Sequence, residues 1–176
     1  MFGVLTCVNG KPTTDYALAI GVRNSYDRSL AVGLTLGSRV FCCDNLAFSG
    51  EVTMHRKHTV NVFRDLPDLI YRMLSQVSSM RERTDGEIAA MKVRELPPAQ
   101  AHHLMVEAVK AGVMPASRLP KVIDAWEEPR HEEFAPRTAW SLFNAFTEVQ
   151  KGTPPRAQME GSLRLSSLFR RELSLN

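Results

Sequence analysis

The sequence predicts an α+β fold in a single domain, residues 1–176, in which an N-terminal antiparallel, hairpin-based β-sheet precedes four to five helices. Apolar residues alternate with period two in residues 16–22 and 30–36, which is typical of strands. From Val62 onwards they recur every three or four residues, which is typical of amphipathic helices. Because strands come first and helices second, residues 1–60 are predicted to be mainly β and 61–176 mainly α.

The first two clear strands form a predicted hairpin. Large side chains alternate with Ala, Gly and Thr in both strands, and the segment between them, "RNSYDRS" at 23–29, is rich in turn-forming residues. Pairing Val22 with Leu30 places the large side chains of both strands on one face. The small residues then line the opposite face, where a closely packed second layer is favoured over a ligand.

The segment "RVFCC", residues 39–43, is predicted to be a buried strand that ends at the turn residues Asp44 and Asn45. Residues 48–54 are predicted to return as another strand. Alternation places Cys42 and Cys43 on opposite faces, so both cannot bind one metal ion without distortion. We therefore expect both to be small core residues.

Helices are predicted for most of the remainder. The first runs from Val62 to about Met80, with Asp65 as its N-cap and Pro67 in its first turn, and is expected to end near Gly86. The boundaries of the later helices are predicted from proline, glycine and N-capping residues. These helices run from Pro97-Pro98 to Gly112, from Ser117 to Pro129 and from Thr138 to Gly152, and a final helix runs through Leu163 and Leu173.

The composition and the known motifs narrow the function classes. Three cysteines without a framework of spacings argue against a secreted disulfide scaffold, and no signal peptide or membrane-spanning run is present in the sequence given. We therefore expect a cytoplasmic protein without membrane contact. The motifs GxxxxGK[ST], GxGxxG, GxSxG and HExxH are missing, so an enzyme is disfavoured and no cofactor is predicted.

A cationic group is the main candidate for binding. The net charge is only +3, but Arg56, Lys57 and His58 lie in the short segment "HRKH". Cations of this kind bind phosphates, although a solvated basic turn is the alternative interpretation. Neighbouring cations and turn residues complete the predicted nucleic-acid or ligand site, because sites are often built at strand ends and turns: Arg23, Asn24, Asp27, Arg28, Arg39, Asp44 and Asn45.

Two further candidates are weaker. A metal-assisted phosphodiesterase or nuclease would use the acids and histidines Asp27, Asp44, Glu51, His55 and His58. Residues three apart on a strand face opposite sides, so His55 and His58 are not expected to share a metal, and no metal site is predicted. Asn144 lies mid-helix among aromatic residues, where a structural clamp is favoured and contact with a ligand is the alternative.

Several of these residues belong to longer segments that look familiar. The segments "GVRNSYDRSLAVGLTLGSRVFCCDNLAFSGE", "RKHT" and "TAWSLFNAFTEVQK" resemble a widespread family of phage- and plasmid-borne proteins of unknown function, over about residues 17–168. Tyr26 stands where that family usually has His. The motif residues are Asn24, Ser25, Asp27 and Ser29; Arg39, Val40, Cys43 and Asn45; Arg56, His58 and Thr59; and Thr138, Trp140, Asn144, Thr147 and Glu148.

The resemblance implies a mobile-element setting near replication and recombination genes, but no known reaction. The leading hypothesis is a nucleic-acid-associated accessory protein that binds or anneals single-stranded DNA. The alternatives are the metal-assisted nuclease and a protein that interacts with host or phage proteins to block a host defence. DNA is the expected partner, and the exposed edge of a small sheet also favours self-association into a homo-oligomer.

Overall fold

The computed structural model describes residues 2–7, 16–23, 31–40, 46–57 and 61–174. At 2–7, 16–20, 23, 36–40, 46–56, 63 and 155 it describes the backbone alone. The described part is α+β, as predicted, with strands up to residue 56 and helices from residue 62 onwards. It contains six α-helices, more than the four to five predicted, together with two short 3-10 helices. That the chain is one domain stays a prediction.

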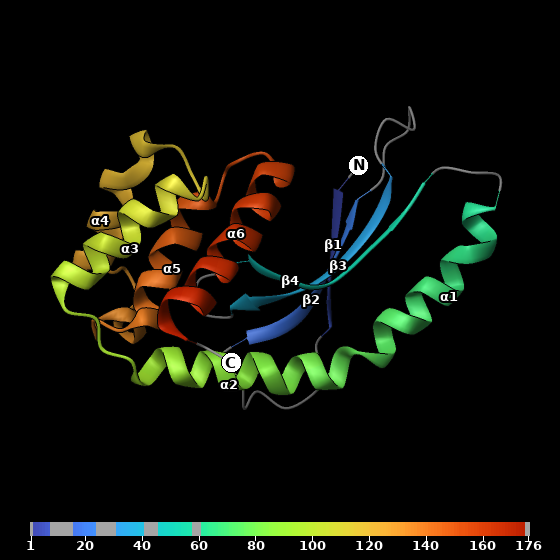
Figure 1. Cartoon of the computed structure of the whole chain (residues 1–176), viewed down its shortest axis with the longest axis horizontal. Coiled ribbons are helices and arrows are strands. Elements are labelled where there is room, and N and C mark those ends of the chain that lie inside the picture. The colour runs from blue at the N-terminus through green and yellow to red at the C-terminus, as the bar shows by residue number, and fades with distance from the viewer. Residues whose placement is uncertain (1, 8–15, 24–30, 41–45, 58–60, 175–176) are drawn as a thin grey trace.

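Four antiparallel strands form the sheet in the order of the sequence: β1 (Phe2–Cys7), β2 (Tyr16–Arg23), β3 (Val32–Val40) and β4 (Leu46–Arg56) (Figure 1). The β2–β3 pair confirms the hairpin but not its register, because Val22 pairs with Leu34 and not with Leu30. The difference is four residues, an even number, so the predicted distribution of large and small residues between the faces is unchanged.

Both faces of the sheet are covered where β2 and β3 are described in full. Leu34 is buried in the main hydrophobic core and Val22 packs against that core. On the other face Gly21, Gly33 and Thr35 are buried as well. The burial of these three residues agrees with the prediction of a packed second layer over the small residues at these positions.

The register between β3 and β4 changes in mid-strand. Thr35 pairs with Thr53 but Gly37 pairs with Phe48, so β4 holds extra residues between these two pairs. Irregularities of this kind bend a strand and increase its twist. β4 is accordingly the long, curved strand that extends toward α6 in Figure 1.

Two helices follow the sheet, α1 (Val62–Ser75) and α2 (Val77–Val93), and they meet at a bend at Gln76. The hydroxyls of Ser75 and Ser79 donate to the carbonyls of Arg72 (2.8 Å) and Gln76 (3.1 Å). Hydroxyls that bond to nearby carbonyls compete with the backbone ladder and often bend helices, which accounts for a bend without a proline.

Two predicted boundaries in this region are wrong. The cap of α1 is Asn61, four residues before Asp65, so Pro67 lies inside the helix. Gly86 does not end the helix but lies within α2, where open space surrounds it. A single glycine lowers helix stability without stopping the helix when the flanking turns continue.

The remaining helices are α3 (Pro98–Lys110), α4 (Leu119–Glu127), α5 (Ala139–Gln150) and α6 (Pro155–Leu173), with the 3-10 helices η1 (Ala116–Arg118) and η2 (Glu132–Phe134). The predicted stops at Gly112 and Gly152 are confirmed, because both adopt positive φ (69° and 74°) just after a helix. Ser117 lies inside η1 and caps no helix.

The core is centred on α5, whose residues Ala139–Thr147 are all buried. The Trp140 and Phe143 rings stack with centroids 6.0 Å apart. Phe169 of α6 meets Phe143 and Phe146 edge to face, at 5.3 Å and 6.3 Å. A helix that is buried all round must be enclosed by other elements, and α2, α4, α6 and η2 all contact α5.

Backbone and charged contacts join the helical layers. The segment after α2 pairs with the start of α5, through Leu96 N–H to the Arg137 carbonyl (2.9 Å) and Ala139 N–H to the Arg94 carbonyl (2.8 Å). Arg170 of α6 forms a bidentate ion pair with Glu87 of α2, at 2.7 Å and 3.1 Å. α3–α6 therefore form a helical body beside the sheet; α2 runs along the lower side of both, and α1 rises at the other side of the sheet (Figure 1).

Candidate functional site

The predicted cationic site is divided between the two ends of the sheet. Arg23 pairs with Gly33 at one end of β3, and Arg56 pairs with Val32 at the same end. Arg39 lies six residues further along β3, roughly 20 Å away for an extended strand. Arg39 is therefore not beside Arg23 in the described backbone, and whether both belong to one binding site stays a prediction.

The other predicted site residues are described to different extents. Lys57 follows β4 directly and is exposed, so one cation of the "HRKH" segment faces solvent. The remaining residues lie outside the described part of the chain: Asn24, Asp27, Arg28, Asp44, Asn45 and His58. Whether they belong to a binding site stays a prediction.

The residues of the metal-assisted alternative are also described only in part. Glu51 and His55 lie on β4 with their backbone alone described, and its other members are among the residues just named. Leu46 and Arg56, the ends of β4, are about 30 Å apart in an extended strand, and the stretches that contain Asp44 and His58 join opposite ends. Within the described ranges, no three His, Cys, Asp or Glu side chains form a group that could hold a metal ion.

Asn144 is the predicted residue whose surroundings are described best. It is 1% exposed, and its Nδ2 donates to the carbonyl of Trp140 one turn earlier (2.9 Å). Thr147 in turn donates its hydroxyl to the Asn144 carbonyl (3.0 Å). These bonds within α5 support the clamp that the sequence favours, since a buried amide must find partners.

Asn144 also lines a cavity, and this supports the alternative role. The cavity has a volume of about 480 Å³ and lies between α4, η2 and α5. Small-molecule sites commonly have volumes of roughly 300–1,000 Å³. Phe134 and Ala145 contribute apolar wall, while Ser141 and His131 contribute polar atoms.

The charges around this cavity are balanced. Lys121, Arg130 and Lys151 line it together with three acids, Asp124, Glu128 and Glu148. The Glu148 carboxylate forms an ion pair with Lys151 Nζ at 2.5 Å and another with Arg130 Nη1 at 3.8 Å. Two cations therefore compensate its negative charge. The cavity as a whole therefore has no strong preference for an anion or a cation.

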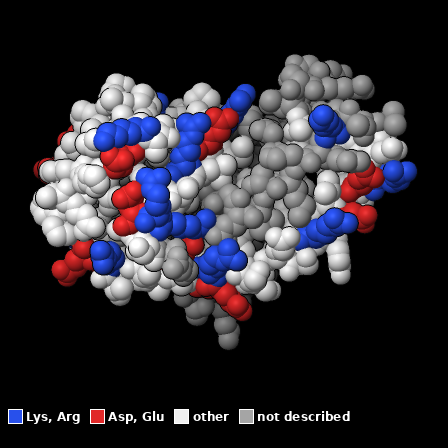
Figure 2. Space-filling view, in the orientation of Figure 1, with Lys and Arg blue, Asp and Glu red and all other residues white. Residues whose placement is uncertain are grey.

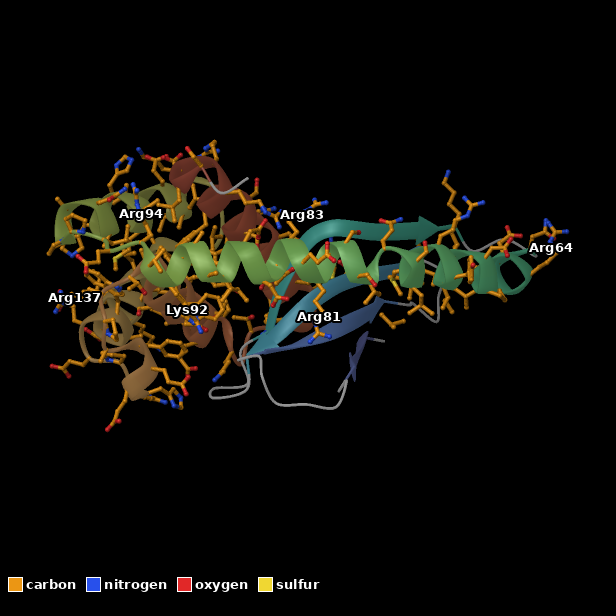
Figure 3. The ribbon with its side chains drawn as sticks, turned by 90° about the horizontal axis from the view of Figure 1, so that it is seen from below. Arg64, Arg81, Arg83, Lys92, Arg94 and Arg137 are labelled. Atoms are coloured by element: carbon orange, nitrogen blue, oxygen red, sulfur yellow. The ribbon has the colours of Figure 1, made fainter. Side chains whose placement is uncertain are left out.

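A second candidate surface lies on the outside of α1 and α2. Figure 3 shows six cations spread along this side of the molecule, which we call the α1–α2 cationic surface: Arg64, Arg81, Arg83, Lys92, Arg94 and Arg137. From Arg64 to Arg94 the two helices rise roughly 45 Å. Arg137 is held by its guanidinium lying over the Trp126 ring, 4.9 Å from the centroid.

The cations on this surface alternate with acids. Asp65 pairs with Arg64 (3.3 Å), and Glu87 pairs with Arg170 of α6. On another face of the molecule, the one drawn in Figure 2, Lys and Arg likewise lie among Asp and Glu. The α1–α2 cationic surface is therefore a line of separate positive groups.

An exposed aromatic residue accompanies this line. Tyr71 of α1 is 75% exposed, and Ile70 and Leu74 beside it are also exposed. Arg64 and Tyr71 are seven residues apart, so they share one helix face about two turns from each other. This face therefore combines a cation with an aromatic ring that is open to solvent.

The comparison with protein families agrees with the extent of the resemblance in the sequence. A family model described as "Domain of unknown function (DUF932)" matches residues 7–169, which is most of the chain. The chain belongs to the DUF932 family. No curated protein and no solved structure matches it.

The residues matched by the DUF932 model include those of the cavity beside α5 and those of the α1–α2 cationic surface. The family description assigns a role to neither. In this DUF932 domain, Asn144 and Glu148 could be suggested from the sequence because they are polar residues four apart in an aromatic helix. Tyr71 was missed, because an aromatic residue in an amphipathic helix is ordinarily a core residue. The four-residue spacing of Ile70 and Leu74 gives no sign that these side chains stay exposed.

Proposed function

We propose that this DUF932 protein is a nucleic-acid-associated accessory protein that binds single-stranded DNA along the α1–α2 cationic surface. The observation that carries the proposal is the exposed Tyr71, which shares a helix face with Arg64 at one end of that surface. The resemblance in the sequence implies a mobile-element setting near replication and recombination genes, which is compatible with this proposal.

The cations supply sequence-independent attraction. Each Lys or Arg that neutralises a phosphate releases condensed counterions, and this favours binding at low salt. Arg81 of α2 and Arg94 just after it lie on opposite sides of the helix in Figure 3, so a strand that follows the helices would contact both by crossing α2. Acids such as Glu82 and Asp85 lie on the same helix, so the affinity is expected to be modest and lost at high salt.

Tyr71 favours a single strand over a duplex. The bases of a single strand are free to stack on an aromatic ring, whereas those of a duplex are stacked on each other. Ile70 and Leu74 enlarge the apolar area around the ring. Lys57, which is exposed after β4, precedes α1 in the chain and is suited to extend the phosphate path.

The two alternative functions gain no specific support from the described residues. No group of acids and histidines suited to a nuclease metal is present among them. A host-defence partner would need an interface, and nothing described distinguishes one from ordinary surface. No described helix is long and apolar enough to cross a membrane.

Fluorescence anisotropy with a labelled oligothymidine and a labelled duplex tests the proposal. We expect binding to the single strand at low salt, weaker binding to the duplex, and loss of both at high salt. Replacing Tyr71 by Ala is expected to weaken single-strand binding by about 1–3 kcal/mol, the usual contribution of one stacked base.

The matched control is Tyr71→Phe, which keeps the ring and is expected to retain nearly all of the affinity. Absence of binding to either oligonucleotide at low salt would overturn the proposal. Equal losses in Tyr71→Ala and Tyr71→Phe would instead show that the ring does not stack on bases.

A further inference from the structure

We propose that the cavity between α3 and α6 binds a phosphate dianion, either as inorganic phosphate or as the phosphoryl group of a small monoester. The cavity has a volume of about 270 Å³ and lies where the C-terminal end of α3 meets α6, two helices that contact each other (Figure 1). None of the described residues that line it belongs to the α1–α2 cationic surface or to the cavity beside α5. The inference can therefore fail without affecting the proposed function.

The first step is the set of polar groups in the cavity wall. Every polar side chain among the described lining residues can donate a hydrogen bond: Arg164, Ser167 and Arg171. They follow each other at spacings of three and four residues on α6, so they share one face of the helix. The other described lining residues, two leucines and an alanine, carry no charge. A wall with two guanidiniums, a hydroxyl and no carboxylate suits an anion better than a cation.

The second step is that both guanidiniums are held in place and remain accessible. Arg164 donates through Nη1 to the Gly112 carbonyl (2.7 Å), a neutral group that does not cancel its charge. Arg171 donates through Nε to a carboxylate oxygen of Glu172 (2.9 Å). A guanidinium has five N–H donors, so each arginine keeps others for a ligand. Both side chains are exposed, so a ligand reaches them without any opening of the core.

The third step is the arrangement of the donors, which favours a phosphate over a carboxylate. Arg164 and Arg171 are about 10 Å apart along the helix axis, and Ser167 lies between them. A phosphoryl group presents three acceptor oxygens in different directions, so it can accept from both guanidiniums and from the hydroxyl at once. The two oxygens of a carboxylate lie in one plane and are satisfied by a single arginine fork.

The fourth step is the charge around the cavity. The nearby acid Glu107 bonds to Lys110 (2.7 Å) and does not line the cavity. The pKa of the Glu107 carboxyl is lowered, first by this hydrogen bond and further by the charges of Lys110, His103 and Arg171. Cations from both helices therefore act on the same boundary between α3 and α6, and their charge also favours an anion in the cavity.

Chemical-shift titrations at constant ionic strength test the inference, with inorganic phosphate, glycerol phosphate and acetate as the three ligands. We expect saturable shifts of the Arg164 and Arg171 Nε–H signals with phosphate, and much weaker binding of acetate. Arg171→Gln is expected to weaken phosphate binding about tenfold, because hydrogen bonds to a charged group are lost. Arg156→Gln is the matched control, because it removes an exposed arginine of α6 that does not line the cavity.

Ser167→Ala is a second test that leaves both arginines in place. Its side chain is exposed, so the variant is expected to keep the unfolding midpoint and to bind phosphate about threefold more weakly. Tyr71→Ala is expected to leave phosphate binding unchanged, which separates this result from the proposed function. Binding of glycerol phosphate as well as inorganic phosphate would identify a monoester site, and binding of inorganic phosphate alone a site for the free ion.

Three results would overturn the inference. The first is the absence of saturable shifts with either phosphate. The second is acetate binding as tight as that of phosphate, because the donors would then not select a phosphoryl group. The third is an equal loss of phosphate binding in Arg171→Gln and Arg156→Gln, which would show that only the net charge matters.

Discussion

α5 and α1 differ in what their apolar residues do. In α5 every residue from Ala139 to Thr147 is buried, and its aromatic rings pack against Phe169. In α1 the buried side of the helix includes Met73, while Tyr71, Ile70 and Leu74 remain exposed. Most of the recognisable sequence motif in α5 therefore maintains the core, whereas the less distinctive α1 presents groups that can bind a partner.

The largest expected effect is in the α5 core. Replacing Phe146 by Ala removes a fully buried ring from the contact with Phe169 and is expected to lower the free energy of unfolding by about 3–5 kcal/mol. Tyr71→Ala is the matched change on α1 and is expected to alter it by less than about 0.5 kcal/mol. Urea unfolding followed by circular dichroism measures both, and similar losses would contradict the contrast between the helices.

Two helical glycines sharpen the same contrast. A Cβ at Gly161 of α6 would lie 2.7 Å from the Val113 carbonyl and from Gln150 Nε2, so Gly161→Ala is expected to destabilise by about 1–3 kcal/mol. Gly86 of α2 has nothing within 4 Å, and Gly86→Ala is expected to stabilise by about 0.5–1 kcal/mol. A melting temperature of Gly161→Ala that equals or exceeds that of the unmodified protein would show that the α6 contact is not tight, and a fall in Gly86→Ala would contradict the open space around Gly86.

The local signals in the sequence were sufficient for many helix ends. Gly112, Gly152 and Thr138 mark ends through their own backbone or side-chain chemistry, so neighbouring residues are enough to predict them. The start of α1 was misplaced because Asp65 and Pro67 are also favourable in the first turns of a helix that begins earlier. The predicted hairpin register was wrong because pairings that differ by four residues place the same side chains on the same faces, so alternation alone does not distinguish them.

The candidate sites could be predicted from the sequence less well than the helix ends. Arg23 and Arg39 are close along the chain, but their distance depends on where each strand begins, and β3 separates them by most of its length. The cavity depends on how α4 and η2 pack on α5, which no single segment encodes. Asn144 was found because a polar residue among aromatic residues is unusual, and its helix bond supports the clamp.

A moderate effect is expected at the N-terminus of α5. The Thr138 hydroxyl accepts the Ser141 N–H at 3.3 Å and lies 3.2 Å from the Ser141 hydroxyl. Thr138→Ala removes this cap and is expected to cost about 1 kcal/mol, whereas Thr138→Ser keeps the oxygen and is expected to cost much less. Equal unfolding midpoints for the two variants would contradict the capping role.

The smallest expected effect is electrostatic and lies on α3, outside both candidate sites. The hydrogen bond from Lys110 (2.7 Å) lowers the pKa of the Glu107 carboxyl below its ordinary value. The stability that this bond contributes is present above the unfolded-state pKa and is lost as the pH falls through the folded-state pKa. In Lys110→Met the pKa of Glu107 is expected to return upwards in an NMR titration, and an unchanged pKa would contradict this assignment.

The proposed binding surface is tested most directly by the salt dependence of single-strand binding in two double variants. Arg81→Gln with Arg94→Gln removes two cations from the α1–α2 cationic surface, and Lys110→Gln with Arg156→Gln removes two exposed cations from α3 and α6. Both change the net charge equally. The first pair is expected to reduce the slope of log K against log salt by about 1.4, roughly 0.7 for each phosphate contact, and the second to leave it unchanged. Equal slopes in the two variants would contradict binding along α1 and α2.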